Sequence, residues 1–198
     1  VLVINDRSTD RTAAILAELQ ARVNLGREAN PRLRVLQGAD RPDGWMGKTW
    51  ALEQGVQASS ADWLWFVDAD MDLHPAALRA AWSEAVRRQV HGITCWPRLA
   101  CSTVWQSSVA VMFSLLLWSL YRARRVNDPT YPDAVAVGGF ILVRRAAYLQ
   151  SGGHASVRGE VVEDVALAYR LKGQGTPLRL VAAGSLACTH MYGDLRAI

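Results

Sequence analysis

The sequence is poor in cysteine and lysine, and each shortage excludes a class of protein. Its three cysteines, Cys95, Cys101 and Cys188, form no CxxC pair and no cysteine–histidine spacing of a zinc site. A disulfide scaffold and a structural zinc site are therefore excluded, and reduced thiols are expected. Of the 198 residues, 51% are hydrophobic and 20% are charged, which excludes a disordered tail and leaves enough apolar surface for a core.

The positive charge is mild and is carried almost entirely by arginine. The 22 basic residues stand against 18 acidic ones, a net charge of +4, and Lys48 and Lys172 are the only lysines. That excess is too small for a dedicated nucleic-acid-binding protein, so no nucleic-acid partner is expected. It suits anionic ligands such as phosphates or lipid head groups.

Strand and helix patterns alternate along the chain. Strands are predicted at 1–4, 33–36, 63–67, 141–143 and 178–181, and helices from about 10, over 47–58, from 75 to about 88, and over 162–172. This order is typical of an α/β fold with a mostly parallel sheet, here expected as a single domain over residues 1–198. The sequence begins inside an apolar strand and stops without a terminal helix. We therefore interpret it as a piece of a longer protein, truncated at both ends.

Two acids follow the apolar run at 63–67. Asp68 and Asp70 come directly after this predicted strand, at the sheet edge where open parallel sheets bind ligands. Residues two apart in an extended segment point the same way, so both carboxylates can hold Mg²⁺ or Mn²⁺ with waters and phosphate oxygens. The alternative is a pair of solvated turn acids that cap the helix beginning near Pro75.

Three other known motifs match parts of the sequence incompletely. An EF-hand is excluded because Leu73 and Arg79 occupy its glycine and glutamate positions, and a P-loop is excluded because Pro42 replaces its first glycine. Lys48 either contacts a phosphate or a nucleotide, or is an exposed lysine at the start of a helix. A DxD phosphotransferase stays open as an alternative enzyme, although Asp72 stands where such phosphatases have threonine or valine.

Four landmarks occur together in a characteristic order. They are the NDRSTDRT stretch at 5–12, the DAD at 68–70, the glycine pair at 138–139 before a strand, and the ED at 163–164. In this order and at these distances the chain resembles a family 2 glycosyltransferase of GT-A fold over nearly its whole length. Residues 44–52, 126–129 and 158–164 are similar to the hopanoid-associated (HpnB-type) branch, which is related to ceramide glucosyltransferases.

The resemblance implies a reaction. It implies inverting transfer of a hexose from a nucleotide diphosphate sugar, with a UDP-sugar favoured, to a hydroxyl of a hopanoid- or ceramide-like lipid. A divalent metal, Mn²⁺ or Mg²⁺, is implied as cofactor. Two alternatives stay open: the DxD phosphotransferase, which gives Asp6 no role, and a membrane-bound module that binds sugar nucleotides but has lost its chemistry.

The same resemblance implies roles on the donor side of the site. Asp6 would bind the base or ribose of the nucleotide, and Lys48 is a further candidate for substrate binding. Asp68 would lie towards the sugar and ribose, and Asp70 would hold the metal on the diphosphate, with Asp68 as the second candidate ligand.

On the acceptor side, the resemblance implies that Asp164 is the general base, with Glu163 as second choice. The alternative is that both are ordinary acids of a helix N-terminus. Gly138 and Gly139 are expected to permit a close backbone approach to the sugar or acceptor, or to form a plain turn.

One uncharged segment points to a membrane. Residues 99–121 carry no charge between Arg98 and Arg122, a length sufficient to cross a bilayer. A single crossing would separate the acids at 68–70 from those at 163–164, so we expect 99–125 to hold a helix in the membrane interface, with arginines 122, 124 and 125 on anionic head groups. A buried core helix is the alternative. We expect the protein on the cytoplasmic side of the cell membrane, bound peripherally or through segments outside this sequence.

Overall fold

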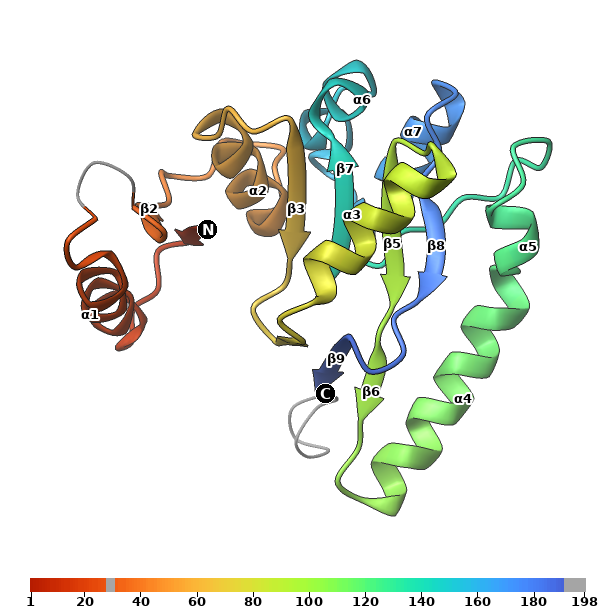
Figure 1. Cartoon of the computed structure of the whole chain (residues 1–198), viewed down its shortest axis with the longest axis horizontal. Coiled ribbons are helices and arrows are strands. Elements are labelled where there is room, and N and C mark those ends of the chain that lie inside the picture. Colours follow the sequence, from red (N-terminus) through yellow and green to blue (C-terminus); the bar gives the residue numbers. More distant parts are fainter. Residues whose placement is uncertain (28–30, 191–198) are drawn as a thin grey trace. The chain divides into compact units, whose positions relative to one another are not determined.

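The computed structural model describes residues 1–27 and 31–190 (Figure 1). The contacts within the chain divide it into two compact units. Unit 1 comprises residues 1–60 and 154–161, and unit 2 comprises 61–153 and the chain from 162 onward. Each unit is described by itself.

Unit 1 is built on a pair of parallel strands, β1 (Leu2–Asn5) and β2 (Arg34–Gln37), with helices α1 (Thr12–Asn24) and α2 (Gly47–Gln57) and the 3₁₀ turn η1 (His154–Val157). The side chain of Asn24 joins α1 to the start of β2, because its amide donates to the Leu33 carbonyl (2.6 Å) and its oxygen accepts from the Leu33 N–H (3.0 Å). The hydroxyl of Thr49 in α2 donates to the Arg158 carbonyl (3.0 Å), which fastens the η1 segment to α2.

The helix α1 makes a polar contact with β2. The Gln20 side chain accepts the N–H of Val35 in β2 (2.8 Å). Leu16, Leu19 and Val23 of α1 are half-buried, whereas Ile15 is 54% exposed. The N–H of Val35 needs an acceptor, and Gln20 supplies it.

Unit 2 contains a four-stranded sheet in the order β3-β7-β5-β8 (Figure 1). Its strands are β3 (Trp63–Val67), β7 (Phe140–Arg144), β5 (Gly92–Trp96) and β8 (Arg179–Ala182). β7 runs antiparallel to both β3 and β5, whereas β5 and β8 are parallel. The α/β class is confirmed, but the pairing is mixed where the alternation of elements predicts a mostly parallel sheet. The reason is that β7 begins beside the carboxyl end of β3, with Phe140 opposite Val67, and runs back along it.

Helices on the sheet form the core of unit 2. α3 (Ala77–Arg88) packs its alanines against side chains of β5 and β7, and α7 (Glu163–Gly173) buries Leu167 and Leu171 completely. α6 (Arg145–Gln150) follows β7 and contacts α7. The buried cluster beside α3 consists of Ala77, Ala85, Ile93, Cys95, Phe140, Leu142, Ala183 and Ala187.

A smaller sheet extends unit 2. It has the order β4-β9-β6, with β4 (Met71–Leu73), β9 (Ala187–His190) and β6 (Arg98–Ala100). β6 leads into α4 (Val104–Leu120), which is followed by the short helix α5 (Ala123–Val126). Among residues 1–27 and 31–190, no helix combines the length and the apolar character that a bilayer crossing requires.

Candidate active site

The acid loop, residues 68–70, joins β3 to β4 and lies beside the glycine pair at 138–139. The register that sets Val67 opposite Phe140 brings the end of β3 next to the start of β7. A Cβ built on Gly139 would come within 2.8 Å of the Met71 sulfur. Position 139 is therefore a close approach between the turn and the residue that follows the acid loop, and any larger side chain would displace Met71.

Within the acid loop, Asp70 is exposed and Asp68 is half-buried. The Asp70 carboxylate accepts a hydrogen bond from the Thr189 hydroxyl of β9 (3.2 Å). This contact joins residues 119 positions apart and ties the loop to the smaller sheet.

The glycine pair also contacts the start of α7. One oxygen of the Asp164 carboxylate accepts the N–H of Gly138 (2.7 Å), and the other accepts the N–H of Val165 (2.8 Å). Charge-assisted hydrogen bonds of this kind hold a carboxylate in a fixed orientation. Asp164 is half-buried, whereas Glu163 is 8% exposed.

The buried hydroxyl of Thr94 binds the backbone of the glycine turn. Thr94 of β5 is fully buried, and its hydroxyl accepts the N–H of Val137 (2.8 Å). The turn at 137–139 is thus anchored to the central sheet while it contacts Met71 on one side and Asp164 on the other. It brings the two acid groups predicted from the sequence into one part of unit 2. Neither Thr94 nor Met71 carried a sequence signal.

The acid loop offers some of the ligands of a divalent-metal site, and phosphate oxygens of a substrate would complete the coordination. The described residues contain no group of three or more histidines, cysteines, aspartates or glutamates that could hold a metal ion. Two carboxylates two positions apart are nevertheless suitable oxygen ligands for Mg²⁺ or Mn²⁺, which commonly complete their shell with water and phosphate oxygens. Asp68 and Asp70 therefore fit a metal that is bound together with a diphosphate.

In unit 1, Asp6 follows β1 and lies close to two glycines. A Cβ on Gly47, at the start of α2, would lie 3.3 Å from one Asp6 carboxylate oxygen, and a Cβ on Gly38 would lie 3.4 Å from the other. The Arg7 guanidinium donates to the same carboxylate (3.0 Å). Asp6 thus lies near the N-terminus of α2, where the helix dipole favours an anion.

Lys48 is the exposed second residue of α2. Its charge acts on His154, whose imidazole is buried in η1. Burial, followed by the charge of Lys48, lowers the pKa of His154 to about 4, so the imidazole is neutral near pH 7. Asp6 and Lys48 belong to unit 1 and the other predicted site residues to unit 2, so their common approach to one donor stays a prediction.

Lys172 has a structural role that the sequence did not reveal. Its ammonium donates to the carbonyls of Val126 (2.9 Å), Asp128 (3.0 Å) and Asp133 (2.6 Å). In the same segment the Asn127 side chain makes two hydrogen bonds of 2.8 Å with the backbone of Leu180 in β8. The stretch at 126–133 is therefore bound to α7 and to the central sheet.

Comparison with known proteins agrees with this architecture. The sequence profile described as "Glycosyl transferase family 2" matches residues 1–151. The 4,4'-diaponeurosporenoate glycosyltransferase of Staphylococcus aureus (strain MRSA252) is 25% identical over 196 residues, which cover 98% of this chain and 49% of that protein. The chain thus spans about half the length of the curated relatives it matches.

Solved structures show the same fold. The mannosyltransferase PcManGT of Pyrobaculum calidifontis, in complex with GDP-Man and Mn²⁺, has a TM-score of 0.66 at 16% identity, over 99% of this chain and 48% of that one. The glucosyl-3-phosphoglycerate synthase of Mycobacterium tuberculosis, in complex with Mn²⁺ and UDP-glucose, has a TM-score of 0.54 at 18% identity, over 98% of this chain and 61% of that one. The chain belongs to glycosyl transferase family 2 and has the GT-A fold of nucleotide-sugar transferases.

Proposed function

We propose that the protein transfers a hexose from a nucleotide diphosphate sugar to a lipid hydroxyl, with inversion at the anomeric carbon. One observation carries the proposal: the turn at 137–139 contacts Met71, next to the acid loop, and also the Asp164 carboxylate. A transferase needs a site for its leaving diphosphate close to a base for its acceptor. The turn at 137–139 contacts both the residue next to the acid loop and the Asp164 carboxylate.

The family and the acids of the acid loop both support a nucleotide diphosphate sugar as the donor. Solved structures of the same fold hold GDP-Man or UDP-glucose together with Mn²⁺, which supports a nucleotide diphosphate sugar here, with a UDP-sugar as first choice. We assign the diphosphate to the acid loop, the base or ribose to Asp6, and a phosphate contact to Lys48. A bound divalent metal would neutralise the charge that develops on the diphosphate, and Asp70 and Asp68 are the residues to hold it.

The chemistry assigned to the chain is a single displacement. The acceptor hydroxyl gives its proton to Asp164 while its oxygen forms a bond to the anomeric carbon. The bond from that carbon to the diphosphate oxygen breaks, and its electron pair leaves with the nucleotide diphosphate. Glu163, the alternative base, is almost completely buried, which favours Asp164 as the acid that meets an acceptor.

Two observations support a lipid acceptor. The S. aureus relative is named for 4,4'-diaponeurosporenoate, a carotenoid, and the sequence resemblance points to a hopanoid- or ceramide-like alcohol. In addition, only Ala110 of α4 is buried, which disfavours the core-helix alternative for this segment. The exposed apolar side chains of α4 are Val104, Trp105, Val111, Met112, Phe113, Leu115, Leu116, Trp118 and Leu120.

We assign α4 to the interface of the cytoplasmic membrane leaflet. Arg122 and Arg124, just after the helix, are exposed and suited to anionic head groups. Arg125 has a different role: its guanidinium pairs with Asp133 (3.0 Å) and lies 5.0 Å from the centre of the Tyr131 ring. The head-group contact is therefore proposed for Arg122 and Arg124 and not for Arg125.

Donor binding and turnover test the proposal together. In membranes that contain the protein, UDP binding should require Mn²⁺ or Mg²⁺, and Asp70→Asn should weaken it at least tenfold. Asp72→Asn, an exposed acid of β4, is the matched control and should bind like the wild type. Transfer of radiolabelled hexose to a lipid extract should accompany binding.

Two outcomes would overturn the proposal. Metal-dependent binding without transfer of any hexose would identify a sugar-nucleotide binding module. Release of phosphate from phosphoesters, with no effect of Asp6→Asn, would identify a phosphotransferase.

A further inference from the structure

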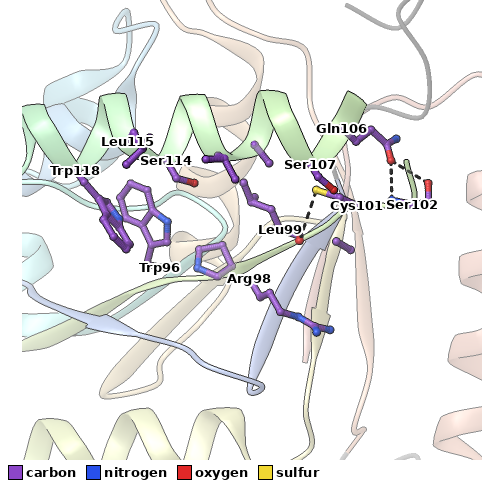
Figure 2. A pocket seen from close by; sticks show the side chains of 14 residues that line it. Trp96, Arg98, Leu99, Cys101, Ser102, Gln106, Ser107, Ser114, Leu115 and Trp118 are labelled. Carbon is purple, nitrogen blue, oxygen red and sulfur yellow. Dashed lines mark hydrogen bonds between the residues drawn. The ribbon is translucent and has the colours of Figure 1, made fainter. Parts of the chain in front are cut away.

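A groove of about 1090 Å³ lies between β6 and α4 in unit 2 (Figure 2). Its floor is the strand β6 with the residues on either side, and its wall is one side of α4. The lining residues on which the argument depends are Trp96, Arg98, Ser102, Gln106, Ser114 and Trp118. This volume is slightly larger than the usual range for small-molecule sites, about 300–1,000 Å³.

The two ends of the groove differ in polarity. Trp96 and Trp118 lie together at one end, and Ser102 and Gln106 lie at the other (Figure 2). The polar end is part of the helix cap, because the Gln106 side chain accepts hydrogen bonds from the hydroxyl of Ser102 (2.9 Å) and the N–H of Thr103 (3.1 Å). These bonds hold the polar end in place without any ligand.

The charge of the groove restricts its occupant. Arg98 is the single charged residue in the lining, and its side chain points away from α4 (Figure 2). No carboxylate lines the groove, so no opposite charge there would attract a basic peptide. The space between the tryptophans and the cap is bordered by leucine, valine, alanine and serine side chains, which suits an uncharged, extended apolar chain.

The smaller sheet connects the groove to the acid loop. Thr189 of β9 pairs with Met71 of β4 on one side and with Leu99 of β6 on the other. Adjacent strands are about 4.8 Å apart, so the backbone of Leu99 lies roughly 10 Å from that of Met71. Thr189 also donates its hydroxyl to Asp70. The groove floor is thus two strands away from the residues assigned to the diphosphate.

We propose that this groove binds the apolar chain of the lipid acceptor and thereby directs its hydroxyl towards the acid loop and Asp164. The inference rests on the proposed function and deepens it by giving the acceptor a location. An added peptide strand is the rival occupant, since β6 pairs only with β9 among the described residues. β6 has three residues, so a peptide would gain few backbone hydrogen bonds there.

Quenching of tryptophan fluorescence by a brominated C18 alcohol, delivered from cyclodextrin, tests chain binding without any need for activity. We expect saturable quenching in the wild type that falls by more than half in the Trp118→Phe variant, because Trp118 lines the groove. Absence of saturable quenching would overturn the inference.

A matched pair of variants on α4 separates the groove from the general surface of the helix. Ser114→Phe fills the groove and should lower the affinity for the brominated alcohol at least tenfold. Ser108→Phe, on the same helix but outside the lining, should leave this affinity unchanged. Circular dichroism and UDP affinity should be the same in both, which shows that they fold. Equal weakening by the two variants would contradict a groove site.

Failure of the groove and failure of the proposed function give different results. With hexose transfer as the readout, Ser114→Phe should raise the KM for the lipid at least tenfold and leave kcat nearly unchanged. Transfer with an unaltered KM would refute the groove and keep the glycosyltransferase. Saturable binding of the alcohol without any hexose transfer would refute the proposed function, and with it the acceptor role of the groove.

Discussion

The helices α4 and α7 belong to the same unit and have opposite relations to its core. α7 begins with the acids Glu163 and Asp164 and buries two leucines completely, whereas α4 buries one alanine and leaves most of its large apolar side chains exposed. In α7 apolar residues provide stability and hold a polar group in position. In α4 apolar residues provide a surface. An apolar helix in a sequence is therefore not evidence of a core helix.

The largest effect is expected from a substitution in the first turn of α7. Asp164→Asn should keep UDP and metal affinity and lower the rate of transfer to an alcohol acceptor by about 10²–10⁴-fold, because the amide cannot accept the hydroxyl proton. Single-turnover transfer is the measurement, and Asp72→Asn serves as the control. A rate within a few-fold of the wild type would show that Asp164 positions the turn and is not the base.

The same truncation in the two helices tests their relation to the core. Leu171→Ala in α7 should lower the free energy of unfolding by about 2–5 kcal/mol, because Leu171 is fully buried. Leu115→Ala in α4 should change it by about 0.5 kcal/mol or less, since Leu115 is 60% exposed. Denaturant titration in the absence of lipid measures both. A similar loss in the two variants would mean that α4 packs against other protein in solution.

In unit 1, the buried His154 is expected to make the free energy of unfolding depend on pH. The pKa of His154 is lowered to about 4 in the folded protein, against an ordinary value near 6.5. Between these values the unfolded chain binds a proton that the folded chain does not, so stability should fall as the pH decreases from about 6.5 to 4. The expected loss is up to about 3 kcal/mol. Denaturant titrations across this range should show a smaller decline for His154→Gln, and an identical decline would contradict the assignment.

The smallest effect concerns two cysteines. Burial raises the pKa of the Cys95 thiol to about 12, so Cys95 should not react with a maleimide at pH 7.5 while the protein is folded. Cys101 lies in the groove lining, is partly exposed and should react. Mass spectrometry of the labelled protein distinguishes the two positions. Labelling of Cys95 before Cys101 would show that the sheet under α3 opens more readily than the groove.

The strands β3, β7 and β8 and the acid loop were predictable because their signals are local, whereas β5 was not predicted. The apolar run at 63–67 forms β3, and the two acids after it lie at the strand end, as its composition indicates. The contact of the glycine pair with Asp164 agrees with the order of landmarks, but the sequence alone does not give the hydrogen bond from Gly138. The catalytic and binding roles themselves stay predictions.

The other features of the fold depend on contacts between residues that are far apart in the sequence. β4 and β6 have three residues each, and both become strands only through pairing with β9, more than 80 positions away. The direction of β7 is set by the coil before it, which returns the chain beside the end of β3. Thr94 resembles any other strand threonine until its hydroxyl meets Val137. Such features follow from tertiary contacts, which no local pattern contains.

Lys172 has a consequence for how the 126–133 segment is maintained. Surface loops with several converging carbonyls are often organised by a bound calcium ion, which must be supplied by the surroundings and is lost to chelators. Here the cation is covalently attached to α7 and reaches the same kind of carbonyl cluster at the end of a flexible stem. Lys172 therefore links the arrangement of this loop to the folding of α7.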